Sequence, residues 1–281
     1  MLKNKYYSLK CLTNDQEDKS EDTFTGLNFE KILYIFEEMQ NKELLISNED
    51  KSKIEKIKRI IYIQKSIDIL FDDQKNGDKV KEETNVIQTK IEDLFKSDKI
   101  YRTAFLQYLN NKRIEGKLDL SNKSIEMLGS YFNTLNNYII EHKDYFLFKI
   151  LTLLSMTYYF IDKKNNKKIF LSKYIINCTE FTNQQFWIDY LKETINNDLK
   201  GNEELRKPII ELSYKEVKNF NSKAIHICVY SNIFSLIKMM IDLKVKKNFI
   251  IEWLNIVKDN IFFITEEEKN EIINLINCEE N

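Results

Sequence analysis

Glycine and proline are nearly missing from this chain, which holds 5 glycines and 1 proline in 281 residues. All-β folds use glycine at their tight turns, and nucleotide-binding α/β folds need glycine-rich loops that cradle phosphates. The two glycines nearest to each other, Gly116 and Gly129, lie thirteen positions apart. The sequence has no GxxxxGK, GxGxxG or GxSxG motif. These features predict an all-α protein and exclude kinase, GTPase and dehydrogenase functions.

Apolar residues recur at helical spacing along most of the chain. The cleanest stripe alternates spacings of three and four, which places its members on one helix face: Ile125, Leu128, Phe132, Leu135 and Ile139. Capping boxes, which pair a Ser or Thr with a Glu or Gln three residues later, mark further helix starts: Thr182 with Gln185, Ser213 with Glu216, and Thr265 with Glu268. We expect about eleven helices and no strand, arranged as an irregular antiparallel array that is HEAT-like or an orthogonal bundle.

The length of the chain suits one large domain or two small ones. Residues 13–25 are acidic and polar and show no periodicity. Residues 1–26 are therefore predicted to be an N-terminal tail with an acidic disordered linker. We expect an N-terminal helical subdomain at residues 27–97 and a main helical domain at residues 98–281.

One apolar run allows two interpretations. Residues 145–161 read YFLFKILTLLSMTYYFI, with Lys149 as their single charge. A membrane span needs ~20 apolar residues, and this run is shorter. A helix that is apolar on all sides is also typical of the centre of a large helical domain. A buried core helix is the preferred interpretation, and membrane contact is the alternative.

The four cysteines do not form a metal-binding pattern. No CxxC pair occurs among Cys11, Cys178, Cys228 and Cys278, and structural zinc sites need ligands at short spacings. The first residues, MLKNKYYSLKCLTNDQ, lack a long apolar stretch, so no signal peptide is expected. We expect reduced thiols and a cytoplasmic protein.

The titratable residues do not predict a catalytic centre. The two histidines are His142, near a helix end where the dipole favours a cation, and His226, between two isoleucines of an apolar helix. Structural roles are the preferred interpretation of both. Adjacent carboxylates point to different faces of a helix and indicate solvated surface. No enzyme activity, catalytic residue, cofactor or metal ligand is predicted.

Two lysine-rich loops interrupt the helical pattern. The first holds Lys163, Lys164, Lys167 and Lys168, and the second holds Lys244, Lys246 and Lys247. The net charge is -1, so no overall basic field exists to hold nucleic acid. A lysine near an anionic membrane contributes ~1 kcal/mol. The first loop is therefore a candidate contact for an acidic partner or an anionic lipid, although a solvated loop is the simpler alternative.

Aromatic residues are frequent, with 18 Phe, 15 Tyr and 2 Trp. Tyr158, Tyr159, Phe186 and Trp187 are predicted to be core residues that define the fold. A ligand platform is the alternative, but aromatic residues at helical spacing more often pack in a core.

Several stretches resemble a known family. They are FLQYLNNKR at 105–113, MLGSYFNTLNNYIIEHKDYFLFKILTLLSMTYYF at 127–160, KIFLSKYIINCTEFTNQQFWIDYL at 168–191 and SNIFSLIKMMIDLKVKKNFIIEWLNIV at 231–257. Together they resemble the helical middle domain of the Set-binding-factor proteins, which are myotubularin-related pseudophosphatases. That domain follows a DENN module in the family and also occurs in stand-alone proteins. The resemblance covers about residues 100–275.

The shared features are aromatic: Lys143-Asp144-Tyr145-Phe146, Thr157-Tyr158-Tyr159 and Phe186-Trp187. The chain departs from the family after the last pair, where it has Ile188-Asp189 in place of Asn-Ala. The resemblance implies a non-enzymatic helical module in an endomembrane or vesicle-trafficking setting. It does not extend to Rab exchange, because no DENN, PH or phosphatase module lies in these 281 residues.

We therefore expect a helical scaffold or adaptor that binds protein partners in membrane trafficking and contacts endomembranes peripherally. A regulator of a small GTPase and a structural subunit of a larger complex are the alternatives.

Overall fold

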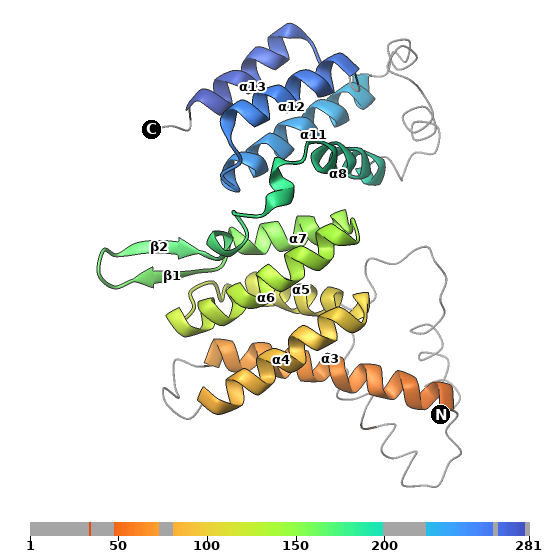
Figure 1. Cartoon of the computed structure of the whole chain (residues 1–281), viewed down its shortest axis with the longest axis vertical. Helices are drawn as coiled ribbons and strands as arrows, with labels where there is room; N and C mark the ends of the chain where they lie inside the picture. Colours follow the sequence, from red (N-terminus) through yellow and green to blue (C-terminus); the bar gives the residue numbers. More distant parts are fainter. Residues whose placement is uncertain (1–33, 35–47, 73–80, 199–222, 261–263, 279–281) are drawn as a thin grey trace. The chain divides into compact units, whose positions relative to one another are not determined.

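The computed structural model describes residues 34, 48–72, 81–198, 223–260 and 264–278. Within these ranges the protein is mostly helical, with nine α-helices and one two-stranded hairpin (Figure 1). The prediction that the protein is mostly helical is confirmed for the described residues. The prediction that it has no strand is wrong. The tail at 1–26 and the Ser213 capping box lie outside the described residues.

The chain divides into two compact units, Met1–Tyr131 and Phe132–Asn281. The predicted boundaries at residues 26 and 97 stay predictions. The described helices of the N-terminal unit are α3 (Asn48–Asp72), α4 (Lys81–Ser97), α5 (Lys99–Ile114) and the first half of α6 (Asn122–Glu141). The C-terminal unit adds α7 (Tyr145–Ser155), β1 (Tyr159–Asp162), β2 (Lys167–Phe170), the 3-10 helices η1 (Leu171–Tyr174) and η2 (Thr179–Thr182), α8 (Gln184–Asp198), α11 (Lys223–Asp242), α12 (Lys247–Asn260) and α13 (Glu266–Cys278).

The core of the N-terminal unit is built around three aromatic rings. Phe95 of α4, Phe105 of α5 and Tyr131 of α6 meet edge to face, with ring centroids 5.0 to 6.0 Å apart. Asp98 begins α5 by accepting a hydrogen bond from the N–H of Ile100, as a good N-cap residue does. The Ser124 hydroxyl joins α6 to α3 by donating to the carbonyl of Leu70.

The stripe predicted on α6 is confirmed, because its five members are at most 1% exposed: Ile125, Leu128, Phe132, Leu135 and Ile139.

The core of the C-terminal unit is a cluster of five aromatic side chains. Phe148 of α7 lies at its centre, with four rings at centroid distances of 5.2 to 6.2 Å: Phe181, Phe186, Trp187 and Tyr190. Trp187 is fully buried, and its indole N–H donates to the carbonyl of Phe181 at 3.0 Å. This bond joins α8 to the 3-10 helix η2, so the aromatic cluster also fixes the chain that leads into α8.

The apolar run at 145–161 is not one helix. α7 ends at Ser155, where the hydroxyls of Ser155 and Thr157 donate to the carbonyls of Thr152 and Leu153. Such hydroxyls compete with the helical ladder. The residues that follow, Tyr-Tyr-Phe-Ile, favour a strand. Eleven helical residues extend only ~16 Å, which is too short to span a bilayer.

One described helix stretch, Ile225–Asp242 in α11, is long and apolar enough to cross a membrane by length and composition. About a third of it, 33%, is buried within the protein. α11 packs against α8, α12 and α13.

Of the two predicted capping boxes that lie within the described residues, one is confirmed and one is wrong. Thr265 and Glu268 form the reciprocal pair, with N–H to side-chain distances of 2.9 and 3.2 Å, so this box is confirmed. The box of Thr182 and Gln185 is wrong. Asn183 caps α8 instead, because its side chain accepts from the N–H of Gln185 at 2.9 Å. Thr182 donates to the carbonyl of Thr179 within η2.

Candidate functional site

The four lysines predicted as a partner contact lie at the end of the β1–β2 hairpin, here called the basic hairpin (residues 159–170). Its register pairs Tyr159 with Phe170 and Asp162 with Lys167. At its root, the N–H of Leu171 donates to the carbonyl of Tyr158 at 3.0 Å, and both of these side chains are fully buried. The hairpin is thus held by the core at its root and projects from the helices of its unit (Figure 1).

Three backbone N–H groups at the turn of the basic hairpin are bonded within the turn itself. The carbonyl of Asp162 accepts from the N–H of Asn166 at 2.8 Å. The side chain of Asp162 accepts from the N–H of Lys164, and that of Asn165 from the N–H of Lys167, both at 3.0 Å. Asn166 adopts a left-handed conformation with φ 53°, which asparagine tolerates better than most residues. The sequence Asp-Lys-Lys-Asn-Asn therefore specifies this turn.

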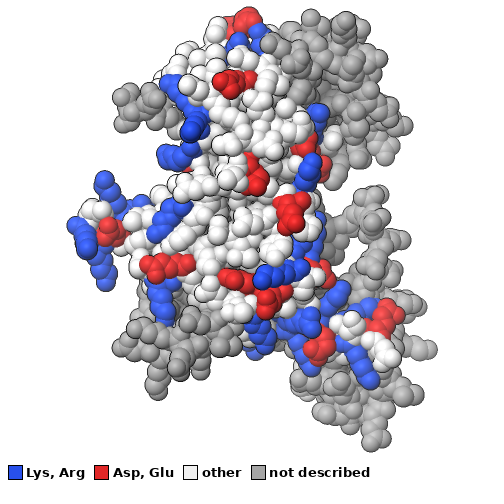
Figure 2. Space-filling model, in the orientation of Figure 1, with Lys and Arg blue, Asp and Glu red and all other residues white. Residues whose placement is uncertain are grey.

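The turn brings together the tip lysines, Lys163, Lys164, Lys167 and Lys168, and all four are exposed. Figure 2 shows lysine side chains gathered over the projecting hairpin. The single carboxylate within residues 159–170 is that of Asp162, which accepts a hydrogen bond from the N–H of Lys164. The ammonium of Lys168 lies 4.2 Å from the centre of the Tyr159 ring, a cation–π contact. The hairpin is therefore strongly positive.

One face of the basic hairpin, here called the apolar face, is formed by Tyr159, Ile161 and Phe170, with Lys168 beside them. These residues share a side because side chains alternate along a strand, and 159 pairs with 170 and 161 with 168. Ile161 is 39% exposed and Phe170 37% exposed. On the opposite face, Lys173 of η1 covers the ring of Phe160 at 5.1 Å.

Sequence reasoning missed the apolar face because it extended the helix of α7 through it. Two short runs that combine apolar and charged residues, YFID and KKIF, lie on either side of a turn that contains Asn165-Asn166. That pattern is typical of a hairpin and was the available signal. The correction also affects Tyr159, which was predicted to be in the core. It lies half-buried on the hairpin, whereas Tyr158, Phe186 and Trp187 are buried as predicted.

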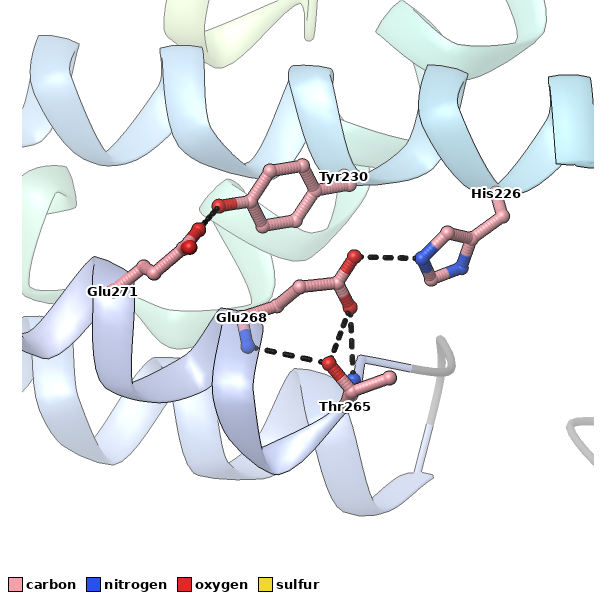
Figure 3. A network of polar contacts seen from close by, with 5 residues as sticks. All are labelled: His226, Tyr230, Thr265, Glu268 and Glu271. Atoms are coloured by element: carbon pink, nitrogen blue, oxygen red, sulfur yellow. Dashed lines mark hydrogen bonds and ion pairs between the residues drawn. The ribbon is translucent and has the colours of Figure 1, made fainter.

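His226 belongs to a polar network that joins α11 to the start of α13 (Figure 3). Its Nε2 lies 2.7 Å from Oε1 of Glu268, while Oε2 of Glu268 accepts from the N–H and hydroxyl of Thr265. Beside it, Tyr230 donates to Glu271 at 2.8 Å. Burial alone would raise the pKa of Glu268, but the bonds from Thr265 and His226 outweigh it and lower that pKa. The network serves as a helix cap and an interhelical link.

The pH dependence of this link follows from the lowered pKa of Glu268. Its stabilisation is present above the ordinary glutamate pKa and is lost as the pH falls through the lowered folded value. We expect Glu268→Gln to reduce the unfolding free energy by about 1 kcal/mol at about pH 7 and by much less at about pH 3. Urea unfolding of both proteins at the two pH values measures this; an equal loss at both would contradict it.

His142 also has a structural contact. Its Nδ1 lies 2.8 Å from the carbonyl of Tyr138, one turn earlier at the end of α6. A carbonyl accepts, so Nδ1 carries the proton. This agrees with its predicted place at a helix C-terminus.

Two of the thiols are held in their protonated form. Burial, followed by the hydrogen bond to Glu180, raises the pKa of Cys178 to about 11. Burial raises the pKa of Cys228 as well. The thiolate is the nucleophile in cysteine chemistry, so neither residue is set up for it.

Described residues of the C-terminal unit line a groove and a second hollow. A groove of about 420 Å³ runs between α7, α8 and α11, with Lys149, Leu153, Thr194, Asn232 and Met239 in its lining. A second hollow of about 480 Å³ holds three carboxylates, those of Glu141, Glu180 and Asp189. Two of the three have partners, since Asp189 contacts Lys143 and Gln185, and Glu180 contacts Cys178 and Thr179. Among the described residues, no group of three or more His, Cys, Asp or Glu side chains could hold a metal ion.

Comparison with known proteins adds no relative: no family model, curated protein or solved structure matches this chain. The likeness to the Set-binding-factor middle domain therefore stays a prediction from the sequence.

Proposed function

We propose that this protein is a non-enzymatic helical adaptor that binds an anionic partner through its tip lysines. The observation that carries the proposal is the placement of four exposed lysines at the end of a hairpin whose root is fully buried. The buried root anchors the backbone that carries these charges, so less backbone entropy is lost on binding. We place the adaptor in vesicle or endomembrane trafficking, which rests on the family resemblance alone.

The roles of the reactive residues support a binding function over catalysis. His142 and His226 both serve helix ends, and the raised pKa values of Cys178 and Cys228 keep these thiols protonated. Catalytic groups are usually arranged with a base beside a nucleophile. Cys178 does lie beside a carboxylate, that of Glu180, but burial raises the pKa of its thiol and keeps it protonated rather than activated.

The proposal predicts that reversing the charge of the tip lysines removes partner binding. Proximity labelling in cells would compare the wild-type chain with the variant Lys163→Glu, Lys164→Glu, Lys167→Glu and Lys168→Glu. We expect the labelled partners to fall at least ~10-fold, because each attractive contact becomes repulsive. A protein whose labelling falls in the four-lysine variant is then purified. Its binding to the wild-type chain and to the variant is measured at low and high salt.

A charge-matched control separates this contact from net charge. The control variant carries Glu at Lys192, Lys238, Lys244 and Lys246, which are also exposed and belong to the same unit. It should retain the partners, and it includes part of the second lysine-rich loop. The same set of partners recovered with the tip variant as with wild type would contradict the proposal.

A further inference from the structure

We infer that the anionic partner of the basic hairpin is a lipid membrane, and that the apolar face enters the boundary between headgroups and acyl chains. This inference rests on the proposed function and names its partner. The side chains that enter are Ile161 and Phe170, while the tip lysines contact the headgroups. Three features of the hairpin carry the inference.

The first feature is the combination of residue types on the apolar face. An aromatic pair, Tyr159 and Phe170 with ring centroids 5.7 Å apart, lies beside an exposed isoleucine. Lys168 covers one of these rings at 4.2 Å. Aromatic residues prefer the membrane interface, and a lysine can extend its apolar stem there while its ammonium stays in water. An acidic protein surface would need the lysines but not the exposed Ile161 and Phe170.

The second feature is the state of the backbone at the turn. A backbone N–H that enters a membrane without a partner costs several kcal/mol. Here the N–H groups of Lys164, Asn166 and Lys167 are bonded to Asp162 and Asn165. These three N–H groups therefore need no water as a partner when the turn approaches the headgroup region.

The third feature is charge complementarity. Residues 159–174 contain five lysines, the four tip lysines and Lys173, against the single carboxylate of Asp162. The cytoplasmic leaflet of a cell membrane is negatively charged, and each lysine near it contributes about 1 kcal/mol, which is about fivefold in affinity. Four lysines together give about a thousandfold preference for an anionic over a neutral surface.

The test uses the full chain with vesicles of pure phosphatidylcholine or of phosphatidylcholine with about 30 mol% phosphatidylserine. We expect sedimentation with the anionic vesicles alone. The four-lysine Glu variant should lose at least about a thousandfold in affinity, because reversal removes the attraction and adds repulsion. The control variant with Glu at Lys192, Lys238, Lys244 and Lys246 should bind like wild type. The double variant Ile161→Ser and Phe170→Ser should lose about tenfold or more, because it keeps the charge but removes the inserted apolar surface.

Insertion itself is measured with Phe170→Trp. Trp187 and Trp253 are fully buried, so they give a constant background fluorescence. On anionic vesicles that contain brominated acyl chains, the new tryptophan should shift to the blue and be quenched. The wild-type chain should show neither change. Binding without quenching, or equal binding by the Ser variant, would overturn insertion.

The outcomes separate this inference from the proposed function. If vesicles do not bind but a purified protein partner binds and is lost in the four-lysine variant, the adaptor proposal stands and the lipid inference is wrong. If neither binds, both are wrong. Circular dichroism and thermal unfolding of each variant show that the fold is intact, which we expect because the changed residues project from the core.

Discussion

Trp187→Ala will reduce the unfolding free energy by about 3–5 kcal/mol. The indole is fully buried and touches Phe148, Phe181 and Phe186, and its N–H bonds to the carbonyl of Phe181. Truncation leaves a large cavity and one buried carbonyl without its donor. Urea unfolding measures the loss. Trp187→Phe should cost less because the ring contacts are partly kept, and the exposed substitution Lys192→Ala should be near neutral. Wild-type stability for Trp187→Ala would disprove the aromatic core of the C-terminal unit.

Phe105→Ala should have an effect of similar size in the N-terminal unit. Phe105 is fully buried and meets Phe95 and Tyr131 edge to face, at 5.0 and 5.6 Å. We expect a loss of about 3–5 kcal/mol in unfolding free energy, from lost apolar burial and from the cavity. The same urea titration measures it, and a loss below about 1 kcal/mol would contradict the three-ring core.

Tyr131→Phe is the matched control for that core. The hydroxyl of Tyr131 is buried and has no hydrogen-bond partner among the residues that the structure describes. Burial, followed by the charge of Glu92, raises its pKa, so the group stays neutral. Removing an unpaired buried hydroxyl should be neutral or stabilise by up to about 1 kcal/mol, whereas deletion of the neighbouring phenyl ring destabilises. A loss of unfolding free energy for Phe105→Ala, together with no loss for Tyr131→Phe, would show that stability depends on the packing of the rings and not on any substitution in this region.

The helices of both units could largely be predicted because their apolar stripes face a core. The stripe from Ile125 to Ile139 is buried at every position, and the capping box at Thr265 needed only local chemistry. The end of α7 could not be predicted in the same way. Residues 145–161 are apolar throughout, so their periodicity does not say where a helix stops.

The candidate site was predicted in part. The four lysines were found from their clustering, but their surroundings depend on the pairing of Tyr159 with Phe170 across the turn. That pairing decides which residues share a face with Lys168, and a one-residue shift would have turned Ile161 to the other side. The sequence around Thr182 misled for a related reason, since Asn183 offers an equally good cap one residue later.

Because the root of the basic hairpin is buried, residues 159–170 can be replaced without disturbing the core. Tyr158 and Leu171 are the buried residues on either side of the hairpin, and none of the residues between them has a buried side chain. Loops and turns outside a core accept insertions and replacement at little cost in stability. The segment from Lys163 to Asn166 is therefore a natural place to insert an epitope tag or graft a different recognition loop. The same property lets binding preference diverge within a dozen residues while the helical fold is kept.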